Sequence, residues 1–240
     1  MTVHQTILEG RTEIAEGTMA FHFEKPPGFA FKPGQAVDVI LVDPVFTDAA
    51  SARHTFSLVS APFENELVVA TRMRDSAFKR ALKSLPIGAP AQLDGPFGSL
   101  TLHNNRARPA VFIAGGIGIT PFMSILRQAA RDQLPHALLL LYSNRRPEDA
   151  AFLSELQELE RQNKRFRLIA TMTQMNKSGQ PWDGETHMID EELVKKVSRD
   201  LSAPIYYVAG PPAMIEAVRQ TLNRAGVDDD DIRSEDFLGY

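Results

Sequence analysis

The sequence predicts a two-domain protein, with an N-terminal antiparallel β barrel or sandwich followed by an α/β domain built on a parallel sheet. Three observations lead to this fold class. The length of 240 residues suits one large domain or, better, two small ones. Short apolar runs separated by turns rich in Pro and Gly fill the first hundred residues, as in antiparallel barrels and sandwiches. After Pro109, apolar strands alternate with helical segments, as in an open parallel sheet.

The first half is expected to contain five strands and one helix. The strands are short runs rich in Val, Leu, Ile and Phe, at residues 18–24, 36–42, 55–60, 66–73 and 89–93. The helix is expected at residues 76–84, with Ser76 as its N-cap.

The second half is expected to alternate strands with helices. Its strands are predicted at residues 109–114, 137–142, 166–172 and 204–209, and its helices at 121–133, 147–163, 190–199 and 212–225. The strand at 137–142 is so apolar that both of its faces must be covered, which is typical of a parallel sheet. Polar residues near the middle of the chain mark the boundary between a domain of residues 1–105 and one of residues 106–240.

Composition excludes several functional classes. The formal net charge of −4 is spread evenly along the chain, so no basic surface for nucleic acid is expected. The absence of Cys excludes disulfides, thiolate catalysis and Cys-ligated zinc or iron–sulfur clusters. The six His residues lie far apart in the sequence, so no metal site is expected. The first residues lack the features of a signal peptide, and glycines break the longest uncharged run, so a cytoplasmic protein without a membrane span is predicted.

A glycine-rich turn joins the first strand of the second half to its first helix. Gly115, Gly116 and Gly118 lack a Cβ atom, so backbone N–H groups there can approach a pyrophosphate closely, next to the positive end of the helix. Thr120 is placed to cap the helix that Pro121 begins. Because open sheets bind ligands at the carboxyl ends of their strands, this turn predicts a phosphate site, with tight packing alone as the alternative.

A second turn of this kind follows the strand at residues 204–209. Gly210 leaves space for a flat ring, and Pro211 is followed by a helix that contains Met214. A helix started by proline, without any ligand, is the alternative for this turn taken alone. Together, the two turns favour a dinucleotide.

Five motifs, in order, resemble those of the ferredoxin–NADP⁺ reductase superfamily of flavin-dependent reductases over nearly the whole chain. They are Phe31-Lys32-Pro33-Gly34-Gln35, Phe56-Ser57-Leu58-Val59-Ser60-Ala61-Pro62, Gly95-Pro96-Phe97-Gly98, the turn at residues 115–121, and Gly210-Pro211-Pro212-Ala213-Met214. The resemblance implies a six-stranded antiparallel barrel that binds FAD in preference to FMN. It also implies a five-stranded parallel domain that binds NADPH or NADH. The expected reaction is hydride transfer from the nicotinamide to flavin N5, with electrons passed to a ferredoxin, flavodoxin or other redox acceptor.

The resemblance also assigns residues to the flavin. Phe56 is expected to pack on the ring and Ser57 to form a hydrogen bond with N5. The family's Arg before this aromatic is replaced by His54, so either Arg53 reaches the pyrophosphate or His54 binds it as a neutral donor. Ser76, the helix start and Arg74 are expected to hold the pyrophosphate as well. The other expected flavin contacts are Thr55, Thr71, Met73 and Phe78.

The same resemblance assigns the nucleotide site, with one departure. The residues expected to contact the nucleotide are Gly115, Gly116, Gly118, Ile119, Thr120, Pro121, Gly210, Pro211 and Met214. Ala209 stands where many relatives carry Cys, which leaves hydride transfer possible at a different rate. Asn144, Arg145 and Arg146 follow the second strand of this domain, where the adenosine ribose should lie. Arg there suits a 2′-phosphate, so NADPH is favoured, with a solvated pair of arginines as the alternative.

The C-terminus matches the end of relatives, in which a carboxylate precedes an aromatic that covers the flavin. Glu235 and Phe237 have that spacing, and Tyr240 is the rival for the flavin face. We prefer Phe237 on the ring and Tyr240 on the adenine or the ring edge. Glu235 would relay a proton toward Ser57, or else be an ordinary solvated carboxylate.

Two other functional classes stay open at this point. One is a flavin-binding electron-transfer or regulatory subunit of a larger complex, without catalysis of its own. The other is a nucleotide-binding module that lacks flavin. A yellow protein that is bleached by NADPH or NADH in the absence of oxygen would indicate the reductase instead.

Overall fold

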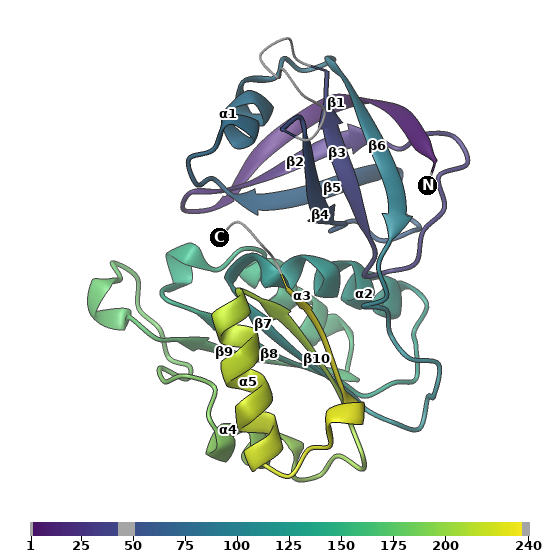
Figure 1. The fold of residues 1–240 in the computed structure, drawn as a ribbon. Coiled ribbons are helices and arrows are strands. Elements are labelled where there is room, and N and C mark those ends of the chain that lie inside the picture. Colours follow the sequence, from purple (N-terminus) through teal and green to yellow (C-terminus); the bar gives the residue numbers. More distant parts are fainter. Residues whose placement is uncertain (1, 43–50, 237–240) are drawn as a thin grey trace.

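The computed structural model describes residues 2–42 and 51–236, which form two layered units stacked on each other (Figure 1). The N-terminal unit is a six-stranded antiparallel sheet of β1 (Val3–Ala15), β2 (Thr18–Glu24), β3 (Ala36–Leu41), β4 (Arg53–Ser57), β5 (Glu66–Arg72) and β6 (Pro90–Phe97), in the order β4-β3-β6-β1-β2-β5. Alternating apolar residues such as Phe21, Phe23 and Leu93 fill its interior. The expected six-stranded antiparallel fold is therefore confirmed.

Strand β1 was not among the expected strands. Its Thr, Glu and Gln residues leave only Thr6 and Leu8 fully buried, and Gly10 lies at a register shift against β2. Apolar alternation is consequently weak. Helix α1 (Ala77–Ser84) does match its prediction, because the Ser76 hydroxyl accepts a hydrogen bond from the Lys79 backbone N–H.

The C-terminal unit is a five-stranded, wholly parallel sheet. Its strands are β7 (Ala110–Gly115), β8 (Leu138–Asn144), β9 (Phe166–Met172), β10 (Ile205–Gly210) and β11 (Ile232–Asp236), in the order β11-β10-β7-β8-β9. Its helices are α2 (Thr120–Arg131), α3 (Leu153–Gln162), α4 (Glu191–Ser198) and α5 (Pro212–Arg224), with short 3₁₀ turns at Gly116–Ile119, Pro147–Asp149, Met175–Lys177 and Asp229–Asp231. Strand β11 had not been expected as a strand.

Helices cover both faces of the parallel sheet. Figure 1 shows α2 and α3 between this sheet and the barrel, with α5 on the opposite face. Phe112 and Phe122 of this unit share one apolar core with Val59 and Val68 of the barrel. The two units are therefore packed together, and the boundary at residue 105 stays a prediction within the segment that joins β6 to β7. Within the described ranges, no helix combines the length and apolarity needed to cross a bilayer.

Two local predictions for this unit were wrong. The helix expected from residue 147 begins at Leu153, because Pro147–Asp149 forms a separate 3₁₀ turn and Phe152 has a φ of 60°. Thr120 is the first residue of α2 rather than its cap, and its hydroxyl donates to the Ile117 carbonyl. The preceding 3₁₀ turn runs directly into the helix, which removes the extended residue that an N-cap requires.

Candidate functional site

The two predicted turns meet at the carboxyl ends of adjacent strands β7 and β10. A Cβ on Gly115 would lie 2.0 Å from Met214 Sδ, and one on Gly118 would lie 2.2 Å from the carbonyl oxygen of Ala209. A Cβ on Gly210 would meet only Met214 Sδ tightly, at 3.1 Å, with the Gly115 backbone nitrogen at an ordinary 3.4 Å. Glycine at these positions allows one turn to pack on the other, which is the spatial arrangement that both sequences indicated separately.

A cavity of about 430 Å³ opens beside these turns. Its predicted members are Arg74, Gly115, Gly116, Asn144, Arg145, Pro211 and Met214, and its members not foreseen from the sequence are Arg72, Ile117, Ser143, Asp149 and Thr173. Gly118, Ile119, Thr120, Pro121, Arg146 and Gly210 do not line it; Ile119 and Thr120 are buried beneath the turn. Arg74 lines this cavity, and its expected contact with a flavin pyrophosphate stays a prediction.

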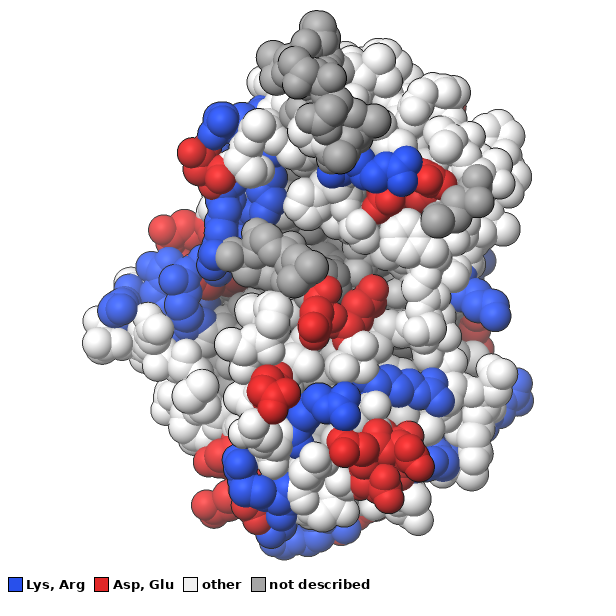
Figure 2. All heavy atoms as spheres, in the orientation of Figure 1, with Lys and Arg blue, Asp and Glu red and all other residues white. Residues whose placement is uncertain are grey.

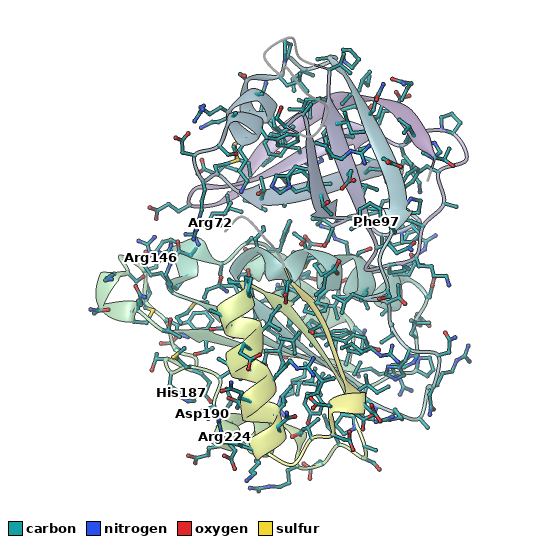
Figure 3. The ribbon with its side chains drawn as sticks, in the orientation of Figure 1. Arg72, Phe97, Arg146, His187, Asp190 and Arg224 are labelled. Carbon is teal, nitrogen blue, oxygen red and sulfur yellow. The ribbon has the colours of Figure 1, made fainter. Side chains whose placement is uncertain are left out.

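Asp149 organises the cationic edge of this cavity. Its side chain is 2% exposed and lies 2.9 Å from Arg72 and 3.1 Å from both Arg145 and Arg146. Burial alone would raise the pKa of Asp149, but the arginines outweigh it and lower that pKa below its usual value. Figure 2 shows Lys and Arg gathered at the boundary of the two units, where Figure 3 labels Arg72 and Arg146. The arginine pair is thus fixed by an internal carboxylate, and three cations surround one anion.

A cluster of rings lies on the barrel side of the boundary. His54 and Phe56 are stacked, with ring centroids 4.7 Å apart and planes at 17°, and Phe78 of α1 lies 5.4 Å from His54. Both rings of β4 are on the same side of the strand, as alternation requires. Met73 is half-buried beside this cluster, and Thr71 is buried within β5.

Two buried polar groups find no partner among the described residues. Ser57, next to Phe56, is 2% exposed, and its Oγ makes no hydrogen bond within those residues; the same holds for the buried Oε2 of Glu235 on β11. Burial raises the pKa of Glu235, whose Oε1 lies 3.9 Å from where a Cβ on Gly98 would sit. Buried polar atoms are normally paired, so these two fit a bound molecule with hydrogen-bonding atoms, as the expected flavin has.

Lys79 is a cation of this region that sequence reasoning missed. Its side chain is only 5% exposed and its Nζ donates to the Arg72 carbonyl over 2.9 Å. Burial and nearby Arg74 lower the pKa of Lys79, and its charge in turn adds to burial in lowering the pKa of His54. The signal was present, because Lys79 lies between Phe78 and Leu82 on the apolar face of α1.

Arg53 is paired with carboxylates of the barrel. It forms ion pairs of 3.1 Å with Asp38 and with Asp94, and Thr55 donates to Asp38 as well. Arg53 and Thr55 alternate with His54 along β4, so they lie on the opposite side of the strand. These pairs favour His54 over Arg53 at a pyrophosphate, and both assignments stay predictions. Phe237 and Tyr240 lie outside the described residues, and their roles stay predictions.

Comparison with known proteins gives consistent matches. Residues 112–220 match the family model described as an oxidoreductase NAD-binding domain. The chain is 30% identical to ferredoxin–NADP reductase B of Sorangium cellulosum over 209 residues, which cover 82% of each protein. It is 28% identical to the glycine betaine monooxygenase reductase subunit of Chromohalobacter salexigens over 92% of its own length, but spans only 60% of that relative.

Solved structures share the fold. A ferredoxin–NADP⁺ reductase from Neisseria gonorrhoeae with bound FAD and NADP aligns with a TM-score of 0.80 at 21% identity, over 98% of this chain and 99% of that one. The FAD- and NAD-binding domain of a nitric oxide dioxygenase from Vibrio cholerae aligns with a TM-score of 0.81 at 19% identity, over 98% of both chains. At such identities, the likeness concerns the arrangement of barrel and parallel sheet.

Proposed function

The chain belongs to the ferredoxin–NADP⁺ reductase superfamily, and on that premise we propose that it is an FAD-dependent NAD(P)H reductase. The observation that carries the proposal is a pair of buried groups, Ser57 Oγ and Glu235 Oε2, that find no hydrogen-bond partner among the described residues. Ser57 ends β4 of the barrel, and Glu235 on β11 of the parallel sheet approaches Gly98, which follows β6 of the barrel. A ligand that reaches both units is proposed to pair with these two atoms.

The residues present suit FAD. Phe56 and His54 offer a ring face, Ser57 a hydroxyl, and Lys79 with the N-terminus of α1 a cationic end suited to a pyrophosphate. When bound, FAD would accept a hydride from the nicotinamide and release the two electrons singly.

The residues of the chain position the cofactors, keep water from part of the boundary between the units, and hold a proton on Glu235. The apolar core shared by the two units keeps water from the part of the boundary that it fills, between residues such as Val59 and Phe122. The raised pKa keeps Glu235 protonated to higher pH than an ordinary glutamate, so its carboxyl can donate a hydrogen bond or a proton beside Ser57. Gly115, Gly116 and Pro211 line the cavity for the second cofactor, with backbone N–H groups at the start of the turn.

The pyridine nucleotide is proposed to be NADPH, with NADH as the alternative. The carboxylate of Asp149 pairs with three arginines, Arg72, Arg145 and Arg146. Arg146 also pairs with Glu16 at 3.0 Å, which leaves more positive than negative groups at this edge. The excess positive charge supports a 2′-phosphate at this edge. The arginines are already engaged, however, so a phosphate would have to compete with Asp149 for their N–H groups.

The electron acceptor is proposed to be a redox protein of the ferredoxin or flavodoxin type. Relatives that support this include the propane 2-monooxygenase reductase component of Rhodococcus jostii, 27% identical over 89% of this chain and of which the chain spans 57%. A cytoplasmic location stays a prediction from the sequence.

One purified sample tests the proposal. Denaturation should release FAD, and anaerobic mixing with NADPH or NADH should bleach the flavin absorbance before a one-electron acceptor restores it. Release of FMN alone would contradict the cofactor assignment. A flavin that neither nucleotide reduces would indicate the non-catalytic subunit instead, and a colourless protein that cannot be loaded with FAD would contradict the whole proposal.

A further inference from the structure

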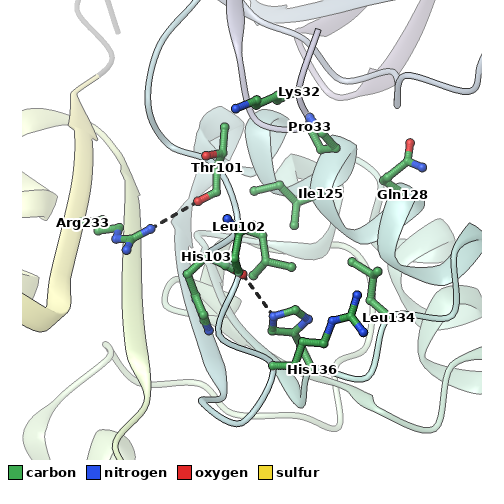
Figure 4. Close-up of a pocket in the computed structure, with 12 residues that line it drawn as sticks. Lys32, Pro33, Thr101, Leu102, His103, Ile125, Gln128, Leu134, His136 and Arg233 are labelled. Atoms are coloured by element: carbon green, nitrogen blue, oxygen red, sulfur yellow. Dashed lines mark hydrogen bonds between the residues drawn. The ribbon is translucent and has the colours of Figure 1, made fainter.

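A second cavity, of about 660 Å³, lies apart from the nucleotide turns (Figure 4). The barrel contributes Lys32 and Pro33, the segment between the units contributes Thr101–Arg106, and the α2 side contributes Ile125 and His136. The volume is that of typical sites for small organic molecules. No residue of the proposed cofactor site lines it.

The lining has one sign of charge. Lys32, Arg106 and Arg233 line the cavity, and no Asp or Glu is among the described residues that line it. The guanidinium of Arg233 already makes two hydrogen bonds, to the Tyr207 hydroxyl at 3.2 Å and to the Thr101 carbonyl at 3.5 Å. Arg106 is exposed, and no ion pair to it is found within the described ranges. An anion would be attracted to this cavity.

His136 provides a buried group without a partner. It is 4% exposed, and its Nε2 donates to the His103 carbonyl at 3.1 Å, because a carbonyl oxygen only accepts. Its Nδ1 makes no hydrogen bond to any residue that the structure describes, and Figure 4 shows the ring among the lining residues, held by the bond to His103. A buried nitrogen of this kind costs free energy unless a ligand or water pairs with it.

Part of the remaining lining is apolar, beside the polar Thr101, Asn104 and Gln128, so the cavity can hold a hydrocarbon group as well as a charged one. Leu102, Ile125 and Leu134 line the same cavity as Arg106 and His136. A bare inorganic anion would leave this surface unused. A carboxylate attached to a small hydrocarbon group would use both parts.

We propose that this cavity binds a small organic carboxylate, with its anionic group between Arg106 and His136 Nδ1 and its apolar part against Ile125 and Leu134. In the neutral ring Nε2 carries the proton, so Nδ1 can only accept a hydrogen bond, as a carboxylate does. The carboxylate therefore binds when His136 takes up a second proton at Nδ1. Of the titratable and charged groups, Arg106 and the His103 ring, 5.2 Å away, face His136. Burial and Arg106 lower the pKa of the free His136, so the proton arrives with the anion.

The site has a direct structural connection to the proposed reductase centre. Arg233 belongs to β11, two residues before Glu235, and bonds Thr101 of the segment that joins the two units. A ligand in this cavity would therefore contact Arg233 on β11, the strand that also carries Glu235. The proposal does not depend on the reductase activity, because no flavin or nucleotide contact enters it.

Benzoate is a suitable probe, followed by NMR of the ¹⁵N-histidine-labelled protein with its cofactors bound. We expect a saturable shift of His136 Nδ1 toward the imidazolium form, and tighter binding as the pH falls from about 8 to about 6. Arg106→Ala should weaken benzoate at least about tenfold, the loss expected for one charge-assisted hydrogen bond. Arg161→Ala is the matched control, because Arg161 is an exposed arginine paired with Glu158 on α3.

Arg106 is exposed, so its variant should fold, and an unchanged melting temperature of that variant would verify this. Absence of a saturable His136 shift would overturn the proposal, as would an equal loss of affinity in the control. Binding of inorganic phosphate as tight as that of benzoate would also overturn it, because the apolar lining would then contribute nothing.

Discussion

His54 stands where the resemblance to the superfamily places an arginine, and Lys79 supplies a positive charge near it. His54 is uncharged at neutral pH, since burial, together with Lys79, lowers its pKa. Lys79 brings the missing positive charge to the same corner from α1, where its Nζ is already held by the Arg72 carbonyl. We propose that this cation and the N-terminus of α1 together hold the pyrophosphate of the flavin.

Lys79→Met tests whether Lys79 supplies the positive charge that the pyrophosphate needs. We expect FAD affinity to fall about tenfold or more, the value for one charge-assisted hydrogen bond, with a smaller effect on NADPH. Flavin titration of the apoprotein measures it. Lys83→Met in the last turn of α1 is the control and should leave the affinity unchanged. A normal FAD affinity in Lys79→Met would mean that His54 and the helix start suffice.

The arginine pair next to Asp149 can be tested in the same way. Arg145→Ala with Arg146→Ala should weaken NADPH at least about tenfold more than NADH, if their N–H groups bind a 2′-phosphate. Binding titrations with both nucleotides measure the difference. Equal losses would show that the arginines only neutralise Asp149, which three cations surround in the free protein.

Glu235 should make stability depend on pH. Its folded pKa is raised by burial, so the unfolded chain loses this proton first as the pH rises above about 4.3. The folded protein is therefore progressively destabilised until the pH passes the folded pKa. Glu235→Gln, which does not titrate, should match the wild type in acid and be more stable at neutral pH. Urea unfolding across that range measures this, and parallel curves would contradict the burial of an unpaired carboxyl.

At the scale of elements, the turn after β7 depends on glycine for two different reasons. At Gly118, a Cβ would clash with the Ala209 carbonyl at 2.2 Å, and that carbonyl belongs to β10 backbone that cannot move aside. At Gly116, φ is +54° but the space around a Cβ is open. The first position is therefore limited by packing, and the second only by backbone conformation.

Gly118→Ala should consequently cost more than Gly116→Ala. We expect a loss of about 3 kcal/mol or more for Gly118→Ala, as in overpacked cores, against about 1–2 kcal/mol for Gly116→Ala, as for a left-handed residue. Chemical denaturation gives both values. Nucleotide affinity should also fall in Gly118→Ala, because the two turns would separate. Equal losses of unfolding free energy would mean that the backbone around Gly118 shifts to accommodate the Cβ atom.

Elements with strong periodicity could be predicted from the sequence, and elements fixed by tertiary contacts could not. Strand β9 and helix α5 are apolar at the expected spacing and lie within a residue of their predicted bounds. Helix α3 was placed six residues early, because the arginines hold Asp149 in a separate turn that no local pattern shows. Strand β11, with only Ile232 fully buried, owes its form to pairing with β10.

The candidate site divides in the same manner. Glycine turns, Ser57 and Ser76 could be predicted, because motif spacing identifies them. Asp149 and Arg72 could not, since their importance arises from a contact between segments far apart in the chain, the Arg72–Asp149 pair across the unit boundary. Lys79 was missed although its place on the apolar face of α1 was a signal.

At the scale of the whole molecule, Arg127 holds the two units together. It extends from α2, is 17% exposed, and pairs with Glu155 of α3 at 2.6 Å. On the barrel side it reaches Glu64 at 3.4 Å and the Val59 carbonyl at 3.4 Å. Nearby, the Ser124 hydroxyl donates to the Ser60 carbonyl at 2.7 Å. The boundary thus combines a shared apolar core with a few specific polar bonds.

Removing the charge of Arg127 should therefore affect the whole molecule rather than one helix. Arg127→Met keeps most of the volume but leaves Glu64 and Glu155 without their shared cation, so we expect a loss of about 2–3 kcal/mol, somewhat below that of a fully buried pair. For a chain of this length, the melting temperature should fall by roughly 5–10 °C, as calorimetry would measure.

The control Arg161→Met removes an exposed pair with Glu158 and should change the melting temperature little. Because Arg127 spans the boundary, its loss should also allow the units to shift, so the apparent affinity for NADPH should fall although no nucleotide contact is removed. An unchanged affinity with a lowered melting temperature would show that the shared core alone sets the relative position of the units.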